Sequence, residues 1–513
     1  MKFNRDRWVF GGNVDSSFLV IVMSKCLSAP AWFCAIAGLS LALDPPRAVA
    51  QTGTVGLNFT GVTLSDGQTL NNNNGYAPPD SDGAVGPQNI VQLINGAFAV
   101  YDKSTGSRQE LISGRQFWIN AGVDPGTGIV GLGAFNNRII YDPTAGRWIA
   151  AGLSGQSTGN YVMLARSNTA DPTGGWKAVS FLGNLSSDTG GFADYTRLGV
   201  NANGVYVGTN NFVSIAGGLV GTSVFSLPKT DLLAATPTVA NLSRFDGVDT
   251  DVVGMSAQPI INFGPSHGHE PILGTSLANS DFVLSRNDIV GAGAAGAALT
   301  NAAQVFVNPY SLPPLAAQPD GTRSISTIDS RFTGNVYQVG NTIFASHATT
   351  VDGNAAISWV KINELTNNVI QEGILSSPNF DYFQPSIAAN ANGDVVMSFT
   401  RSGLGAGGNL SDFAVVGHSI GDVTTFGDPF LLKASTVGNY HYINGRWGDY
   451  TTTQVDPSNP NVFWTFEEYA LNSNAWATLV TQISVPEPDS LALAAAALAG
   501  LSLAAWRRRG RAA

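Results

Sequence analysis

Two carboxyl groups toward the end of the chain, with a guanidinium group nearby in sequence, have the types that could hydrolyse a glycosidic bond. Arg446 and Asp449 are three residues apart, and Glu467 opens the stretch Glu467–Tyr469. Glycoside hydrolysis needs two separated carboxyl groups, one as an acid and the other as a base or nucleophile. We therefore take Arg446, Asp449 and Glu467 as candidate catalytic residues of a hydrolase acting on glycans. The alternative is that these charges form ion pairs in turns.

Three carboxylates lie close enough in sequence to hold a divalent cation. Asp246, Asp249 and Asp251 fall within six residues, and hard oxygen ligands of this kind suit Ca²⁺. The stretch does not match a complete twelve-residue calcium loop, so solvated turn residues are the alternative. No other cofactor is implied.

One histidine cluster, His267-Gly-His269-Glu270, offers groups that Zn²⁺ can bind. It lies in a Gly- and Pro-rich loop rather than on a helix that would place both imidazoles on one face. A loop without a metal is therefore the favoured interpretation.

Charge and cysteine content narrow the classes of function. The chain has 26 basic and 36 acidic residues, of which nine basic and five acidic ones lie in residues 1–50 and 485–513. Residues 51–484 thus have a net charge of −14, which disfavours nucleic acid and anionic lipid as partners. Both cysteines, Cys26 and Cys34, precede residue 51. The body therefore lacks disulfides, a thiolate nucleophile and cysteine metal ligands.

The body has the pattern of strands joined by tight turns. Short apolar runs alternate with segments rich in Gly, Asn, Asp and Pro. Ile90–Ile94 and Ala97–Tyr101 flank Asn95-Gly96, which is a strong hairpin signal. The same arrangement recurs around four further turns, at 142–146, 201–204, 390–393 and 456–460. We predict an all-β body over residues 51–484.

Related sequence openings recur along this body, near Asp82, Tyr141, Tyr195, Gln258, Phe332, Gln384 and Asp449. They span 367 residues in six intervals, so each repeat is longer than the roughly 40–50 residues of common propeller repeats and should contain one long loop. A repeat that continues without a linker favours a β-propeller, a radial array of four-stranded sheets. We predict seven blades, with six or eight as the neighbouring counts. One or two β-sandwiches are the alternative.

Residues 1–50 have the pattern of an export signal. Lys25 supplies a short positive region, residues 27–43 are mostly apolar, and Ala48-Val49-Ala50 is a small-residue cleavage site. We predict export through the Sec translocon and cleavage after Ala50. The charged residues before Met23 are unlike a signal peptide, so we place the true start of translation at Met23.

The C-terminal residues 485–513 combine three parts. Pro486, Glu487 and Pro488 are followed by a sixteen-residue apolar run, 491–506, and then by Arg507, Arg508 and Arg509. As a helix the run spans roughly 24 Å, slightly short of a hydrocarbon core, and flanking arginines can snorkel to the headgroups. The arginines also mark a cytoplasmic end. We predict a transmembrane helix over residues 491–506, which would hold the chain at the membrane before processing.

This tail resembles the PEP-CTERM sorting signal of Gram-negative bacteria. The resemblance covers the 29 residues 485–513 and depends on Pro486, Glu487, Pro488 and the arginine cluster. It implies processing by an exosortase, a membrane transpeptidase, and a location in the cell envelope, on the cell surface or outside the cell. The alternative is a terminal membrane anchor that is not processed.

The body resembles secreted bacterial sialidase-like propeller proteins. The resemblance depends on four motifs: 78–87 (PPDSDGAVGP), 141–148 (YDPTAGRW), 171–176 (DPTGGW) and 446–450 (RWGDY). Sialidases bind the substrate carboxylate with an arginine cluster and use a Tyr–Glu nucleophile pair, so the resemblance draws attention to arginines 138, 147, 166, 197, 244, 323, 331, 401 and 446. Segment 171–176 is a degenerate likeness of the sialidase Asp-box, a turn away from the active site. The resemblance implies a fold and no particular activity.

Taken together, the sequence favours a secreted or envelope-bound propeller without catalytic function. Its expected ligands are extracellular, either exopolysaccharide or another surface protein. A sialidase-like hydrolase of extracellular glycans is the alternative from a different class. The sequence does not identify the ligand.

Overall fold

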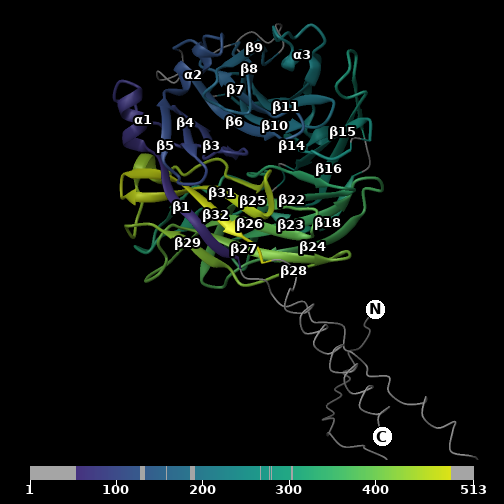
Figure 1. Cartoon of the computed structure of the whole chain (residues 1–513). Helices are drawn as coiled ribbons and strands as arrows, with labels where there is room; N and C mark the ends of the chain where they lie inside the picture. The colour runs from purple at the N-terminus through teal and green to yellow at the C-terminus, as the bar shows by residue number, and fades with distance from the viewer. Residues whose placement is uncertain are drawn as a thin grey trace, which may run out of the picture. The chain divides into compact units, whose positions relative to one another are not determined.

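Seven sheets of β-strand follow one another along the chain. The structure, a computed structural model, describes residues 53–486 apart from 128–132, 157–158, 185–190, 216, 266, 277, 279 and 302–303. Within these residues, each sheet is antiparallel with four or five strands, and a two-stranded ribbon is added. The sheets are arranged as the blades of a ring (Figure 1). The prediction of an all-β propeller with seven blades is therefore confirmed.

Blades 1 to 3 each consist of four consecutive strands, ordered from the inner strand outward. Blade 1 contains β2 (Gly83–Val85), β3 (Asn89–Ile94), β4 (Ala97–Asp102) and β5 (Arg108–Ile112). Blade 2 contains β6 (Ala134–Asp142), β7 (Arg147–Ser154), β8 (Tyr161–Ser167) and β9 (Trp176–Leu182). Blade 3 contains β10 (Phe192–Val200), β11 (Gly204–Phe212), β12 (Leu219–Pro228) and β13 (Ser243–Val248).

Blades 4 to 6 include two sheets with a fifth strand, because β16 and β27 each pair with an additional strand. Blade 4 contains β14 (Met255–Pro259), β15 (His269–Thr275), β16 (Ser280–Val290), β17 (Ala298–Asn301) and β18 (Val305–Ser311). The ribbon β19 (Ala316–Ala317) and β20 (Arg323–Ile325) precedes blade 5, which contains β21 (Tyr337–Val339), β22 (Thr342–Val351), β23 (Asn354–Asn363) and β24 (Val369–Leu375). Blade 6 contains β25 (Phe380–Ala389), β26 (Asp394–Gly403), β27 (Ser411–Ile420), β28 (Val423–Phe426) and β29 (Phe430–Ala434).

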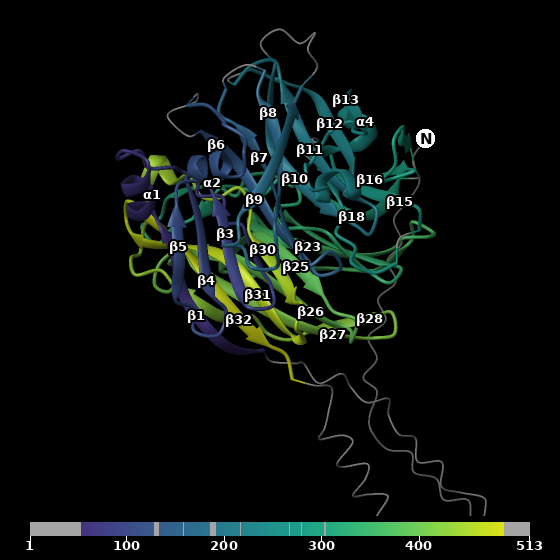
Figure 2. The same ribbon diagram turned by 45° about the horizontal axis from the view of Figure 1, so that its top comes forward.

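Blade 7 closes the ring by combining strands from both ends of the body. Its strands are β30 (Thr452–Asp456), β31 (Asn459–Asn472), β32 (Ala475–Ser484) and, on the outside, β1 (Thr54–Thr63). β1 pairs antiparallel with β32, from Thr54 opposite Ser484 to Thr63 opposite Ala477. Figure 2 shows β1 and β32 side by side. The pairing leaves no open edge between the first and last sheets.

The hairpins of the sheets follow the turn chemistry of the sequence. Gly96, between β3 and β4, has a φ of 86°, which a residue with a side chain rarely adopts. All five predicted hairpins are antiparallel pairs: β3–β4, β6–β7, β10–β11, β25–β26 and β30–β31. The prediction of strands and turns is confirmed at each of these places.

Helices are few and short within the described residues. They are α1 (Leu64–Leu70), α2 (Gly114–Asn120), α3 (Lys229–Leu233), α4 (Thr250–Val253) and the 3-10 turn η2 (Tyr442–Gly445). α1 begins with a capping box, in which Asp66 N–H donates to Thr63 Oγ1 and Thr63 N–H donates to Asp66 Oδ2. None of the helices that the structure describes is long and apolar enough to cross a membrane. The predicted span over residues 491–506 lies outside the described residues.

The core is divided among the blades. Seven clusters of buried apolar side chains occur within the described residues. Six lie mainly between two neighbouring sheets, and the seventh joins blades 7 and 1 with the β19–β20 ribbon and parts of blades 5 and 6. Trp148 contributes to the cluster of blades 1 and 2, and Trp464 and Trp476 to that of blades 7 and 1. These tryptophans are fully buried, so they pack between blades.

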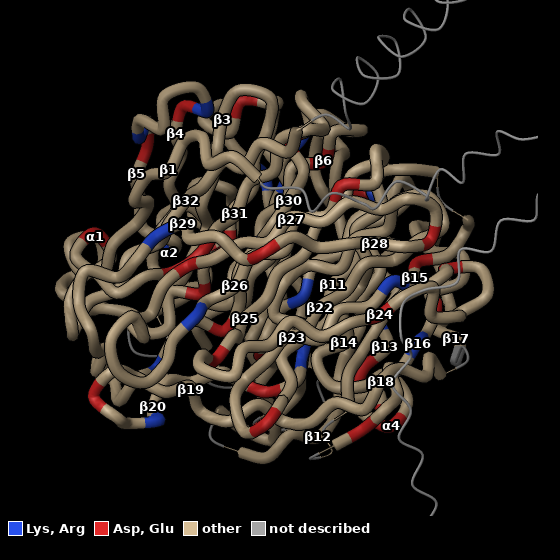
Figure 3. Tube along the Cα trace, turned by 90° about the horizontal axis from the view of Figure 1, so that it is seen from below, with Lys and Arg blue, Asp and Glu red and all other residues tan. Residues whose placement is uncertain are grey.

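Charged residues are distributed over the body. In the view of Figure 3, acidic and basic positions of the described residues are interspersed. Several ion pairs, such as Lys229 Nζ to Asp142 Oδ2 at 2.6 Å, are buried. The distribution agrees with the acidic net charge of the body.

Candidate binding site at the propeller axis

The inner strands of four blades contain the same β-bulge. Register breaks occur near the start of β6, β10, β14 and β25. At each break stands a residue with a positive φ: Asn136 (50°), Tyr195 (56°), Ser256 (53°) and Gln384 (52°). Such backbone is sparsely populated for residues other than glycine. Bulges re-aim the neighbouring side chains, so one end of the axis is lined by specially positioned polar groups.

Side chains from blades that are not neighbours in the ring meet at this end of the axis. The Tyr195 hydroxyl, from blade 3, donates to the backbone oxygen of Asp449 before blade 7 at 3.1 Å. Arg331 Cζ, from the segment before blade 5, lies 4.1 Å from the centroid of the Tyr195 ring. Arg138, from blade 2, lies against Tyr450 of the segment before blade 7. We call this group of residues the axial cluster.

Arg197, whose Cζ lies 5.4 Å from the centroid of the Tyr195 ring, also belongs to the axial cluster. Arg138 and Arg197 both have donors without a partner among the described residues. Arg138 Nε donates to the Thr196 backbone oxygen at 3.0 Å, and Arg197 Nη2 donates to the Gly334 oxygen at 2.5 Å. Nη1 and Nη2 of Arg138 and Nη1 of Arg197 have no hydrogen-bond partner within the described part of the chain. Arg138 is 1% exposed and Arg197 fully buried. Unpaired buried donors cost free energy, so these groups are suited to an acceptor such as water or a ligand oxygen.

Carboxyl groups surround the arginines. Burial raises the pKa of Asp80 well above its usual range, and the charge of Asp449 raises it further. Burial also raises the pKa of Asp82, against the opposing charge of Arg138, and the pKa of Asp194. A carboxyl group held protonated in this way can donate a hydrogen bond or a proton. The cluster therefore combines fixed donors, acceptors and at least one group suited to proton transfer.

Ion pairs occupy the solvent-facing rim of the cluster. Arg331 Nη2 lies 2.7 Å from Asp329 Oδ2, and Arg446 pairs with Asp449. The side chains of Arg331, Asp329, Arg446 and Asp449 are 15%, 23%, 34% and 14% exposed. The rim therefore presents both signs of charge to solvent.

The structure brings two of the three predicted catalytic residues together. Arg446 and Asp449 form the rim ion pair, whereas the fully buried Glu467 accepts from the hydroxyl of Ser398 between blades 6 and 7. Glu468 is the acidic residue near the rim, because its Oε2 accepts from Gly448 N–H at 2.9 Å. Consecutive residues of a strand point to opposite faces, which separates Glu467 from Glu468.

Sequence reasoning did not single out Arg138, Arg197 or Arg331 from the other arginines. The repeated sequence openings were the signal that could have identified these arginines. Three of the openings lie in or beside the axial cluster, namely those at Asp82, Tyr195 and Gln258. Gln258 Oε1 accepts from Arg197 Nε. Arg138 and Arg197 each stand two residues after a positive-φ residue, Asn136 and Tyr195, as Asp82 stands two residues after Asp80.

Two of the three candidate calcium ligands, Asp246 and Asp249, use their side chains in other contacts. Asp246 binds Arg244 through both oxygens at 2.9 Å, and Asp249 caps α4 by accepting from Asp251 N–H at 2.9 Å. In the part of the chain that the structure describes, no group of three or more His, Cys, Asp or Glu side chains is placed to hold a metal ion.

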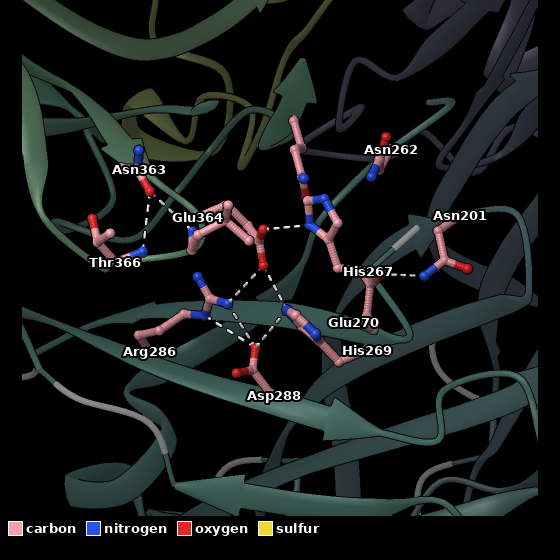
Figure 4. A network of polar contacts seen from close by, with 12 residues as sticks. Asn201, Asn262, His267, His269, Glu270, Arg286, Asp288, Asn363, Glu364 and Thr366 are labelled. Atoms are coloured by element: carbon pink, nitrogen blue, oxygen red, sulfur yellow. Dashed lines mark hydrogen bonds and ion pairs between the residues drawn. The ribbon is translucent and has the colours of Figure 1, made fainter. Parts of the chain in front are cut away.

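The two histidines of the cluster contact Glu364, not Glu270, which is beside them in sequence. Glu364, after β23, lies between His267 Nδ1 at 2.6 Å and His269 Nε2 at 2.5 Å (Figure 4). Glu270 instead accepts from Ile260 N–H at 2.7 Å and Asn201 Nδ2 at 2.8 Å. Arg286 adds a contact to Glu364 at 3.4 Å. The cluster is thus a salt-bridge network that joins blades 4 and 5.

Residues 417–421 (GHSIG) match the G-x-S-x-G pattern of serine hydrolases. They lie at the end of β27 and in the turn to β28, not between a strand and a helix. The Ser419 hydroxyl contacts Thr424 Oγ1 at 2.7 Å, and His418 Nδ1 contacts Asp394 Oδ1 at 2.8 Å. The hydroxyl and the imidazole therefore have separate partners, and the match is a hairpin.

The sorting and cleavage residues fall at or beyond the limits of the described body. Pro486 is its last residue and is exposed. Glu487, Pro488 and Arg507–Arg509, with Ala48 and Ala50 of the export signal, lie outside the described residues.

Comparison with protein families identifies the C-terminal tail. The family described as "PEP-CTERM protein-sorting motif" matches residues 484–509. The chain therefore has a PEP-CTERM sorting motif, which implies export, exosortase processing and a location in the cell envelope or on the surface. A comparison with curated proteins finds no match to this chain.

Among solved structures, the chain is distantly similar to several propellers. Trypanosoma rangeli sialidase is 10% identical over 79% of this chain and 58% of its own, with a TM-score of 0.37. Drosophila Semaphorin 1b, extracellular domains 1-2, is 7% identical over 85% and 88%, with a TM-score of 0.38. Phage phi92 endosialidase is 10% identical over 67% and 66%, also at 0.38. The chain spans 55–58% of the length of the Trypanosoma sialidases, and we take no activity from these similarities.

Proposed function

We propose that this exported protein is a propeller without catalytic function that binds a neutral, hydroxyl-rich glycan, such as a segment of exopolysaccharide, at the rim of the axial cluster. The observation that supports the proposal most is the pairing of charges there. Arg331 with Asp329 and Arg446 with Asp449 present N–H donors and carboxylate acceptors in fixed positions. A sugar hydroxyl both donates and accepts, so it can bind across such a pair.

The balance of charge favours a neutral ligand over an anionic one. Each rim arginine is already paired with a carboxylate, and residues 51–484 have a net charge of −14. An anionic polymer would be repelled by this body at long range. Contacts between non-neighbouring blades, such as Tyr195 with Asp449, hold the rim in place and reduce the ordering cost of binding.

A glycan array probed with residues 51–484 tests the proposal. Arg331→Gln should bind at least about tenfold more weakly than the wild type, since about 1.4 kcal/mol corresponds to a factor of ten. Arg323→Gln is the matched control, because Arg323 pairs with Asp381 at 3.1 Å and is not a member of the axial cluster. Failure of the wild type to bind any glycan, or equal losses in both variants, would overturn the proposal. Capture of a surface protein at the rim instead would assign the site to the other class of ligand.

A glycan hydrolase is the second candidate, and the raised pKa of Asp80 beside Asp449 favours it. A protonated Asp80 would serve as the acid and Asp449 as the second carboxyl group. If this is correct, the wild type releases reducing ends from exopolysaccharide, and Asp80→Asn lowers the rate at least about a hundredfold. The absence of released reducing ends from a glycan that binds would exclude this candidate for that glycan.

For the route of export, we propose that the chain passes the Sec translocon, is cleaved after Ala50 and is then processed at its PEP-CTERM motif. N-terminal sequencing of the exported protein tests the first cleavage. A mature chain that begins anywhere other than Gln51 would contradict it.

A further inference from the structure

The end of the axis opposite the bulges contains an apolar cavity of about 350 Å³. The ends of the inner strands and the turns that follow them form its wall. Its apolar lining includes Ile140, Ile261, Phe263, Tyr337, Val339 and Val455. The last four are only partly buried, so a ligand can reach them. The cavity is separate from the axial cluster, which lies at the starts of the same strands.

The polar side chains around the cavity are already engaged. Gln454 accepts from Val85 N–H at 3.0 Å and donates to the Gly83 oxygen at 2.8 Å. Asp456 accepts from Lys103 Nζ at 2.7 Å and from Trp464 Nε1 at 2.9 Å. Gln338 and Asn390 donate to Gly340 O and Pro460 O. The wall that remains for an occupant is therefore apolar.

The chain leaves the body beside this cavity. Val485 N–H donates to the Asn461 oxygen at 2.8 Å. Pro460, the residue before Asn461, lines the cavity. Beyond Pro486, the next apolar residue is Leu491. At roughly 3.4 Å per extended residue, Leu491 reaches up to about 17 Å from Pro486. The start of the apolar run 491–506 can thus reach the cavity without any change in the body.

We propose that the cavity receives Leu491 and Leu493 of the chain's own tail when residues 491–506 are not in a membrane. A cavity of about 150 Å³ holds a benzene molecule, so the larger volume here suits on the order of two leucine side chains. Burial of this apolar surface is favourable in water. Docking holds the motif Pro486–Pro488 against the body, and insertion of the run into a membrane releases it. The inference is independent of the glycan proposal.

Disulfide trapping tests the docked state in the full chain. With Cys26→Ser and Cys34→Ser, no other cysteine is present. Val339→Cys is combined with Leu491→Cys, and oxidised intramolecular crosslinks are quantified by mass spectrometry. The control combines Val423→Cys with Leu491→Cys, because Val423 on β28 is 59% exposed and does not line the cavity. A docked tail should give at least about fivefold more crosslink at residue 339 than at 423, since docking raises the effective concentration locally.

Phospholipid vesicles provide the second arm of the test. They should reduce the crosslink at residue 339, because the apolar run then enters the bilayer. Equal crosslinking at 339 and 423, or none at 339 in a protein whose circular dichroism is native, overturns the proposal. Crosslinks between chains would assign the cavity to the tail of a second copy, and they would also overturn the intramolecular form. Neither arm uses a glycan, so failure here is distinguishable from failure of the proposed function.

Discussion

The guanidinium carbon of Arg138 lies 3.2 Å from the centroid of the Tyr450 ring. The residues come from blade 2 and from the segment that enters blade 7, so their contact crosses the centre of the ring. Tyr450 also donates from its hydroxyl to the Asn137 oxygen at 2.9 Å. A desolvated cation–π contact of this kind stabilises a protein by roughly 2 kcal/mol. The contact fixes the centre of the propeller, while both Nη groups of Arg138 keep no hydrogen-bond partner among the described residues.

Two substitutions of Tyr450 should separate the ring contact from the hydrogen bond. Tyr450→Phe keeps the ring and loses one hydrogen bond, so we expect a loss of about 1 kcal/mol in the free energy of unfolding. Tyr450→Leu also loses the cation–π contact and should cost roughly 2 kcal/mol more. Urea denaturation of both variants measures the difference. Equal losses would show that the guanidinium–ring contact does not contribute.

The buried pair Asp412 and Glu467 should make the body less stable at higher pH. Burial raises the pKa of Glu467 well above its usual range, and burial together with the charges of Glu467 and Glu468 does the same for Asp412. The folded state therefore retains protons that the unfolded chain loses above a pKa of about 4.3. The stability from these protons is full below that pH and is lost as the pH rises through the raised pKa values.

Glu467→Gln removes the charge and keeps the shape, so its advantage should grow with pH. We expect it to be more stable than the wild type by about 1 kcal/mol or more at pH 8, with the difference shrinking toward pH 4. Denaturation at pH 4, 6 and 8 measures this. Asp412→Asn should show the same trend, and the two effects should not add. A Glu467→Gln variant that is less stable than the wild type at pH 8 would refute the prediction.

Glu364 should have the opposite dependence on pH. Burial raises the pKa of its carboxyl group, but hydrogen bonds from His269 and His267 and the charges of His269 and Arg286 outweigh burial and hold the pKa below its usual range. The stability from the ionised group is therefore full above pH about 4.3 and is lost as the pH falls through the lowered pKa. Acid titration of unfolding should show this loss in the wild type.

Glu364→Gln should flatten that acid dependence. It should also cost about 1.5–3 kcal/mol at pH 7, because hydrogen bonds to a charged group are lost. Glu372→Gln is the control, since Glu372 accepts from Asn308 N–H at 2.7 Å outside the histidine network. If Glu364→Gln and the wild type lose stability equally between pH 5 and pH 3, the network does not control acid stability.

Replacing Pro486, Glu487 and Pro488 by alanine should block processing of the tail. The body is unaffected, because only Pro486 belongs to it and that residue is exposed. We expect a full-length form that stays with the membrane fraction, detected by immunoblotting after fractionation. Alanines at Asn472 and Asn474, in the turn between β31 and β32, provide a control of similar size. Unchanged release of the triple variant would mean that the tail is an anchor alone.

Local signals in the sequence were sufficient for the hairpins and the repeat. Asn95-Gly96 and Asn390–Gly393 specify turns by their own backbone preferences, so neighbouring residues decide the outcome. The number of blades followed from the recurrence of such units. These features depend on short stretches that one sequence contains completely.

The set of side chains that meet at the site depends on strand register and on residues distant in sequence, which local patterns do not contain. Whether Glu467 or Glu468 faces the rim is decided by which side of β31 meets blade 6, and a shift of one residue would exchange them. Glu364 contacts His267 although 97 residues separate the two in sequence. Glu270, which is adjacent to the histidines in sequence, was therefore the wrong glutamate to expect beside them. The bulges that aim Arg138 and Arg197 have no invariant residue type, because asparagine, tyrosine, serine and glutamine all occupy the positive-φ position.

The pairing of β1 with β32 also sets an order of events in time. When the chain is exported with its N-terminus first, β1 has no partner strand until β32 has followed. Contacts between segments so distant in sequence form slowly. Thr54 pairs with Ser484, and Ser484 is the first residue of the matched sorting motif. The ring can therefore close only when the residues that begin the sorting motif are present. A closed blade 7 thus indicates that the strands of all seven blades have been exported before the motif is processed.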